Sequence, residues 1–296
     1  MTGARALVRD RRAVIGFAIL ATFAVVAVLA PILAPLDPNA QPDILRTRFL
    51  APFSSGPDGT TYWLGTDRFG RDILSRLMYG ARISLTVGML SVAVSVLIGC
   101  VVGISAALGG GWIERALMAI TDTVLAMPRL IVLLTLAALW EPSLWLVVLV
   151  LGLTGWMGIA RLARAEVKGI LARPYLDAAR ATGVSGLRLV WFHLLPNTMT
   201  PVIVAAALAV GNAITLESGL SFLGIGVPPP APSWGNMIAT GRDALVHAPW
   251  IAVLPGIFLV LAVVATNLIG DSLRDALDPT TRENPAHLPL PQRTKR

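Results

Sequence analysis

The sequence contains a single cysteine, Cys100, and it lies within an apolar run. One cysteine cannot form an intrachain disulfide or a multi-cysteine metal site. The three histidines are far apart in the sequence, and no group of His, Cys, Asp and Glu has metal-ligand spacing. Neither of the two lysines, Lys168 and Lys295, ends a glycine-rich G-x-x-x-x-G-K-[ST] loop. We therefore expect no metal site and no ATPase site built by this chain alone.

Charged residues are also scarce, at 14% of the 296 residues, whereas a soluble domain carries about a quarter. Because 55% of the residues are hydrophobic, we interpret the formal net charge of +7 as a signal of membrane orientation rather than of nucleic-acid binding. Ser218 and Ser221 lie near glycines, but they lack the second glycine of a nucleophile elbow and have no nearby His or Asp. These features argue against an enzyme and indicate an integral membrane protein.

Six apolar windows are long enough to cross about 30 Å of hydrocarbon. They cover residues 13–34, 83–108, 116–139, 143–160, 199–222 and 250–270. The first window is longer than the roughly 7–15 residues of a signal-peptide core, and Pro31 and Pro35 stand where a cleavage site is expected. We expect an uncleaved first span and an all-α transmembrane fold.

The distribution of arginine and lysine predicts the orientation of the six spans. With the N-terminus inside, sixteen of the 24 basic residues fall in inside segments and seven in outside segments. Six of those seven lie in one long outer segment, and long loops constrain topology less than short ones. The positive-inside rule therefore predicts that both termini are inside.

Three ionisable residues fall within predicted spans: Asp122, Arg129 and Glu217. Such groups normally face protein or water, because exposing them to lipid costs at least a few kcal/mol. Asp122 and Arg129 are seven residues apart, so we expect them on one face of the third span, about 10 Å apart along the axis. Asp122 and Glu217 fit a substrate path or a buried hydrogen bond equally well. For Arg129 we favour a side chain that reaches the headgroups.

The basic segment 161–197 between the fourth and fifth spans predicts a helical hairpin. Pro174 suits a first helical turn, Asp177 complements the helix dipole and Gly183 is a natural helix stop. A second helix is expected to start after Ser185, bury one apolar face and end before Pro196. The four residues predicted on that face are Leu187, Val190, Trp191 and Leu194. The hairpin suits either docking into another protein or lying on lipid headgroups.

The residues of this segment resemble the EAA loop of ABC importer permeases, a Glu-Ala-Ala pattern followed by a glycine and then Leu-Pro. The matching residues are Asp177, Ala178, Ala179, Gly183, Leu195 and Pro196. Asp177 departs from the usual glutamate by a shorter side chain with the same charge. The resemblance implies that the helix beginning at Pro174 is the coupling helix, which docks on an ATPase subunit and transmits its movement to the spans.

Three further blocks resemble the dipeptide, oligopeptide and nickel permeases, and specifically the second, C-type subunit of the permease pair. They are residues 64–85, residues 217–236 and residues 267–279, so the resemblance covers about three quarters of the chain. It implies an inner-membrane subunit of a bacterial or archaeal, binding-protein-dependent importer for peptides or nickel. The implied partners are a second homologous permease, two P-loop ATPases that hold ATP and Mg²⁺, and an extracytoplasmic substrate-binding protein.

The expected organisation has four parts. These are an N-terminal segment and first span (1–36), an outer segment (37–82), a permease core (83–272) with the coupling loop, and an inner tail (273–296). Gly224 and Gly226 permit sharp turns before a proline-rich stretch, which suits either an outer gate or a rigid connection. Two alternatives remain at this stage: a secondary transporter or channel with an ion site at Asp122 or Glu217, and a membrane enzyme or scaffold.

Overall fold

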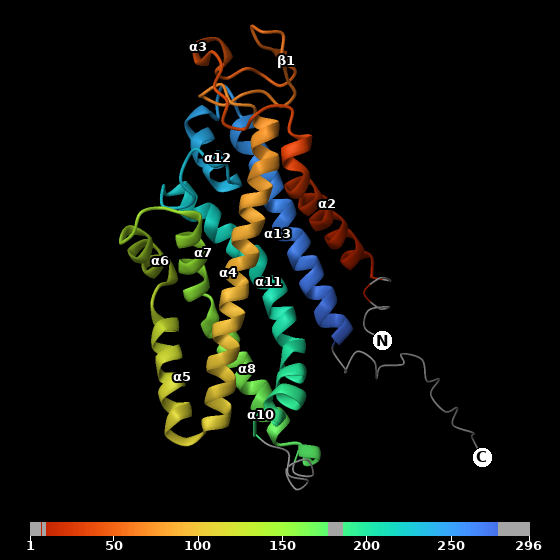
Figure 1. Ribbon diagram of the computed structural model, residues 1–296, viewed down its shortest axis with the longest axis vertical. Coiled ribbons are helices and arrows are strands. Elements are labelled where there is room, and N and C mark those ends of the chain that lie inside the picture. Colours follow the sequence, from red (N-terminus) through yellow and green to blue (C-terminus); the bar gives the residue numbers. More distant parts are fainter. Residues whose placement is uncertain (1–6, 8–9, 177–185, 278–296) are drawn as a thin grey trace, which may run out of the picture.

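The computed structural model describes residue 7, residues 10–176 and residues 186–277, apart from the side chains of residues 137 and 187. The described chain is mostly helical, as predicted, with one short β-hairpin. The elongated bundle has two distinct ends (Figure 1). The first residues of α2 and the last of α13 point toward the end where α10 lies, whereas α3 and β1 lie at the opposite end.

Four helices are each long and apolar enough to cross a membrane. They are α2 (Arg11–Leu33), α4 (Ile73–Gly109), the continuous run of η1 (Val190–Leu194) with α11 (Leu195–Phe222), and α13 (Trp250–Leu277). The 37 residues of α4 give a rod of about 55 Å, which exceeds the roughly 30 Å hydrocarbon layer. The second span was predicted to start at residue 83, whereas its helix starts ten residues earlier, where Asp72 caps it by accepting from Ser75 N–H at 2.8 Å.

The two remaining apolar windows form bent helix pairs rather than straight helices. The first pair, α5 (Gly111–Ala126) and α6 (Arg129–Ala138), is bent by 88°, and the second, α7 (Leu144–Leu153) and α8 (Trp156–Leu171), by 41°. By length and composition, the described residues therefore contain four candidate spans, or up to six if each bent pair counts as one. Pro128 lies at the first break, where its ring and missing N–H prevent continuation of α5.

The segment between α8 and α11 also differs from prediction. The short helix α10 (Gly186–Leu189) continues through the π-helical turn η1 into α11, so no helix ends before Pro196. In the π-helical turn, Leu195 N–H donates a hydrogen bond to the Val190 carbonyl. The Asn197 side chain donates to the His193 carbonyl at 2.6 Å. These contacts satisfy backbone groups around a proline that cannot donate. Leu194 is fully buried as expected, but Trp191 is 64% exposed.

A small cap covers the α3 end of the bundle. It contains α3 (Ile44–Thr47) and an antiparallel hairpin of β1 (Ser54–Ser55) and β2 (Thr61–Tyr62). A buried ion pair at 2.6 Å joins Arg71 Nη2 to Asp67 Oδ2. The same carboxylate lies 3.8 Å from Arg76 Nε, which ties the cap to the start of α4.

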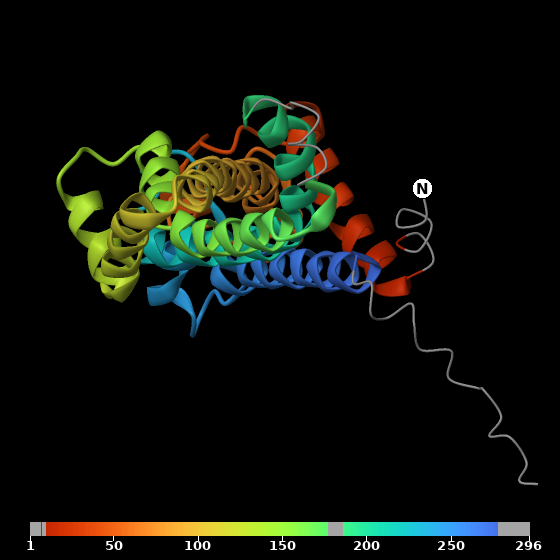
Figure 2. The same cartoon turned by 90° about the horizontal axis from the view of Figure 1, so that it is seen from below.

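An aromatic cluster joins α2 to the core. The Phe23 ring centroid lies 5.4 Å from those of Trp234 and Phe258, which belong to α12 (Trp234–Gly241) and α13. A short 3₁₀ turn, η2 (Arg242–Ala244), follows α12. Figure 2 shows α2 and the α5–α6 pair at opposite sides of the bundle, with α4, α8, α11 and α13 between them. The core is thus built by α4, α8, α11 and α13, and α2 packs against α13 and α4.

Candidate functional site: the loop anchor, the charge ladder and the buried carboxyl

Both described ends of the basic loop are anchored on α8. Pro174 begins a short helical stretch that leads to Leu176, and Leu176 is fully buried. Leu176 belongs to one apolar cluster with Val167 and Ile170 of α8. Leu189 and Leu194, at the other end of the loop, belong to the same cluster. Both described ends of the loop therefore pack in one apolar cluster with α8.

The predicted centre of the coupling helix, Asp177, Ala178, Ala179 and Gly183, lies outside the described residues. Leu195 and Pro196 form the first turn of α11. An open groove of about 640 Å³ runs beside them, where the ends of α8, α11 and α13 converge. It is lined by Glu166 and Arg173 from one side and by Asn197, Pro201 and Arg274 from the others. This surface combines charged and apolar groups, as expected of a site that contacts another protein.

Two sets of ion pairs bind α5 to α8. Asp122 accepts from Arg161 Nη2 at 2.6 Å, and both side chains are about half exposed. One turn of α8 further on, Arg164 Nε donates to Glu114 Oε1 at 2.6 Å, and Lys168 Nζ lies 2.5 Å from the same oxygen. We call these five residues the charge ladder. The spacing of three and four residues on α8 is a helical signal that sequence analysis left unused.

The prediction that Asp122 and Arg129 share one helix face is wrong. The chain bends between them at Met127 and Pro128, so Asp122 stands on α5 and Arg129 is the first residue of α6. Asp122 is engaged by Arg161 in the charge ladder. Arg129 instead lines a pocket between α5, α6 and the α7–α8 break. Neither residue pairs with the other.

Glu217 is a fully buried carboxyl on α11 that serine hydroxyls surround. Ser221 Oγ donates to Oε1 at 2.8 Å, and the hydroxyls of Ser84 and Ser218 lie 3.4 Å from Oε2. Ser84 Oγ also accepts a hydrogen bond from the backbone N–H of Trp234 at 3.2 Å. The group therefore joins α4, α11 and the start of α12. The buried hydrogen bond expected as one alternative for Glu217 is present, and a role on the substrate path stays a prediction.

Gly224 and Gly226 form a tight end to α11. Gly224 has φ +82° and follows Leu223, while Ile225 N–H bonds back to the Leu220 carbonyl at 2.9 Å. This is the Schellman pattern, in which glycine supplies the left-handed residue after the helix. At Gly226 a Cβ atom would lie 2.4 Å from Ser221 Cα, so the returning chain contacts the helix directly. The sharp turns predicted at these glycines are confirmed; a gating role stays a prediction.

Burial also affects one group at the base of the cap. Asp72 is almost fully buried, and this raises the pKa of its carboxyl. Hydrogen bonds from the Ser75 side chain and backbone oppose the rise. Among the described residues there is no group of three or more His, Cys, Asp and Glu that could hold a metal ion.

Several long apolar helices with exposed apolar side chains characterise a multi-pass membrane protein. Residues 95–283 match the family described as the binding-protein-dependent transport system inner membrane component. Residues 3–52 match the N-terminal transmembrane domain of oligopeptide transport permease C. Since the first match covers more than half of the chain, the protein belongs to this family of ABC importer permeases.

Relatives extend over nearly the whole chain. A protein of Brucella suis biovar 1 named as a peptide permease is 40% identical over 283 residues, which cover 95% of this chain and 91% of the relative. The di/tripeptide transport system permease protein DppC of Pseudomonas aeruginosa is 41% identical over 254 residues, covering 86% and 83%.

Solved structures resemble the core of the fold. The inward-facing MetNI methionine ABC transporter contains a chain with a TM-score of 0.56 and 20% identity. The likeness covers 69% of this chain and 96% of that chain, so this protein has additional segments beyond the shared fold. The resemblance to ABC importer permeases seen in the sequence is confirmed.

Proposed function

We propose that this chain is the C-type permease subunit of an ATP-driven importer for peptides in a bacterial or archaeal cytoplasmic membrane. The observation that carries the proposal is the family match over residues 95–283, which includes the basic loop. The names of the relatives above support peptides, and none of those names refers to nickel. The complex would contain a second homologous permease, two ATPase subunits and an extracytoplasmic binding protein.

In the proposed mechanism, ATP with Mg²⁺ binds on the ATPase subunits and drives alternating access. Closure of the ATPases displaces the coupling helix around Asp177 to Gly183. Because Leu176 and Leu189 pack on α8, the displacement passes into α8 and α11. From α8 it reaches α4, against which α8 packs extensively. ATP thus selects between two packings of the spans, by binding one better than the other.

The first test is affinity purification of the tagged chain from its native host in mild detergent, with mass spectrometry of the proteins that copurify. We expect a second permease and P-loop ATPases. Asp177→Arg should reduce ATPase copurification, because it reverses the charge of the docking helix. A chain that purifies alone and moves solute in liposomes without ATP would contradict the proposal and favour a secondary transporter.

A second variant tests transmission rather than docking. Gly183→Val should uncouple uptake from ATP hydrolysis while the protein reaches the membrane in normal amounts, because a β-branched residue resists the positive φ expected of a helix stop. Gly186→Val is a matched control, since Gly186 is exposed and a Cβ atom added there meets nothing within 4 Å. Equal uptake by both variants at equal expression would argue against the coupling assignment.

A further inference from the structure

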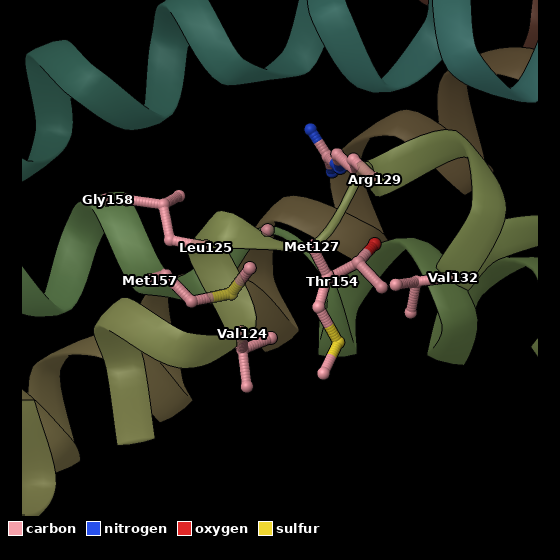
Figure 3. A pocket seen from close by; sticks show the side chains of 9 residues that line it. Val124, Leu125, Met127, Arg129, Val132, Thr154, Met157 and Gly158 are labelled. Atoms are coloured by element: carbon pink, nitrogen blue, oxygen red, sulfur yellow. The ribbon is translucent and has the colours of Figure 1, made fainter. Parts of the chain in front are cut away.

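A pocket of about 240 Å³ lies where both bent helix pairs break. Its lining includes Val124 and Met127 at the end of α5 and Arg129 at the start of α6. Thr154 and Met157 contribute from the α7–α8 junction. Figure 3 shows Arg129 on one side of the pocket and Val124 and Met157 on the other. The lining is thus apolar except for Thr154 and one guanidinium group.

The Arg129 guanidinium has no counterion among the described residues. Its Nε atom is buried and makes no hydrogen bond, although the side chain as a whole is only half-buried. The two acidic groups on this pair of helices behave differently. Glu114 and Asp122 both pair with basic side chains of α8. An unpaired charge within a span is costly unless it faces water or a ligand. Ion pairing explains the charge ladder, but it does not explain the position of Arg129.

The position of the pocket also resembles that of a transport site. The sixteen residues of α5 advance about 24 Å, so the helix breaks at Pro128 before it alone could cross the roughly 30 Å of hydrocarbon. Discontinuous helices in transporters place their breaks at substrate sites, because the interrupted backbone can be solvated there. Arg129 is also the first residue of α6, where backbone N–H groups lack helical acceptors.

The pocket is smaller than the roughly 300–1,000 Å³ that encloses a whole small ligand. It suits one end of an extended substrate rather than all of it. A guanidinium binds a carboxylate through two parallel hydrogen bonds, which a lysine cannot reproduce. Val124, Met127, Val132 and Met157 offer contacts for an adjacent apolar side chain.

We propose that this pocket is a transient binding site for a carboxylate of the transported substrate, held by Arg129 during passage. For a peptide, this is the C-terminal carboxylate, with the last side chain against the methionines. The inference rests on the proposed function, since it requires a substrate that carries a carboxylate. It assigns Arg129 to the substrate path, instead of the headgroup contact expected from the sequence.

The direct test is protection of Arg129 from phenylglyoxal, an arginine-specific reagent, in the purified permease–ATPase complex without binding protein. Dialanine should lower the labelling of Arg129 several-fold, and dialanine amide should not, because the amide lacks the charge. Exposed Arg115 on α5, outside the pocket, is the internal reference and should label equally in both samples. Equal protection by the two compounds, no protection, or an Arg129 that does not react would each overturn the proposal.

Uptake by the complete transporter in proteoliposomes gives the second test. Arg129→Gln should reduce dialanine uptake about tenfold, and Arg129→Lys should restore part of it. Gly158→Leu keeps the charge but fills the pocket, since Gly158 lines it and has no neighbour within 4 Å of an added Cβ atom. It should reduce uptake as well.

The outcomes separate this site from the proposed function. If the wild-type complex shows no ATP-driven peptide uptake, the proposed function fails. If the wild-type complex transports and Arg129→Gln transports equally well, only the site fails. If Arg129→Gln lowers both uptake and the recovery of assembled complex, and labelling of Arg129 in the wild type is independent of dialanine, Arg129 has a structural or lipid-contacting role and the site is overturned.

Discussion

Glu217 forms a buried hydrogen-bonded junction in which no basic side chain participates among the described residues. Because glutamine keeps an acceptor for Ser221 and gains a donor, we expect Glu217→Gln to leave the melting temperature of the assembled complex nearly unchanged. Glu217→Ala should destabilise the fold by roughly 1–3 kcal/mol, since it leaves buried hydroxyls unsatisfied. Thermal unfolding of the purified complexes measures both. A Glu217→Gln complex that assembles fully but no longer transports would instead indicate an ion or proton site.

Gly224 occupies the left-handed position at the end of α11. Its φ of +82° costs a residue with a side chain about 1–2 kcal/mol, so Gly224→Val should destabilise the protein by at least that amount. Gly219→Ala is the matched control. It lies in the last turns of the same helix, has nothing within 4 Å of an added Cβ atom, and should be neutral or stabilising by up to about 1 kcal/mol. Equal melting temperatures for the two variants would show that the left-handed turn is not required.

At the scale of whole elements, the charge ladder holds α5 against α8 through two sets of ion pairs that differ in burial. Glu114 is 13% exposed and accepts from two basic residues, whereas Asp122 and Arg161 are each about half exposed. We expect Glu114→Gln to lower the melting temperature more than Asp122→Asn, whose half-exposed pair should contribute less than about 1 kcal/mol. Thermal unfolding at low and high salt is the measurement. Salt should reduce the small effect at Asp122 more than the effect at Glu114, because exposed pairs are screened more strongly.

Apolar windows located the helices in the sequence, but several of their ends and breaks required other information. The early start of α4 was missed because Arg76 and Arg82 made residues 73–82 look like a loop. Asp72 three residues before Ser75 is a local capping signal that was present. Pro128 likewise predicts a break, yet the uninterrupted hydropathy of residues 116–139 suggested a continuous span.

Candidate site residues were predictable where the signal was local and were missed where it was long-range. The glycines at 224 and 226 lie in a short proline-rich segment whose composition predicts a turn. The serine shell of Glu217 includes Ser84, which is 133 residues away in the sequence, and no periodicity brings the two together. The same holds for Arg164 and Glu114, which are 50 residues apart.

At the scale of the whole molecule, single-cysteine labelling tests which end faces the cytoplasm and whether the bent pairs cross the membrane. Because Cys100 is the single cysteine and is buried, a Cys100→Ala background allows single-cysteine reporters. Leu45 in the cap is 80% exposed, Tyr175 beside the basic loop is 43% exposed, and Trp140 between α6 and α7 is 58% exposed. Each can be replaced by cysteine and tested with a membrane-impermeant maleimide in spheroplasts.

The positive-inside rule places the basic loop on the cytoplasmic side, so Leu45→Cys should label in intact spheroplasts and Tyr175→Cys only after permeabilisation. The reverse result would invert the orientation. Trp140→Cys then decides the number of spans. If each bent pair crosses the membrane, it labels from the same side as Leu45→Cys, which gives six spans and supports a pocket at Arg129 within a crossing helix. If the pairs are re-entrant, it labels with Tyr175→Cys, which leaves four spans.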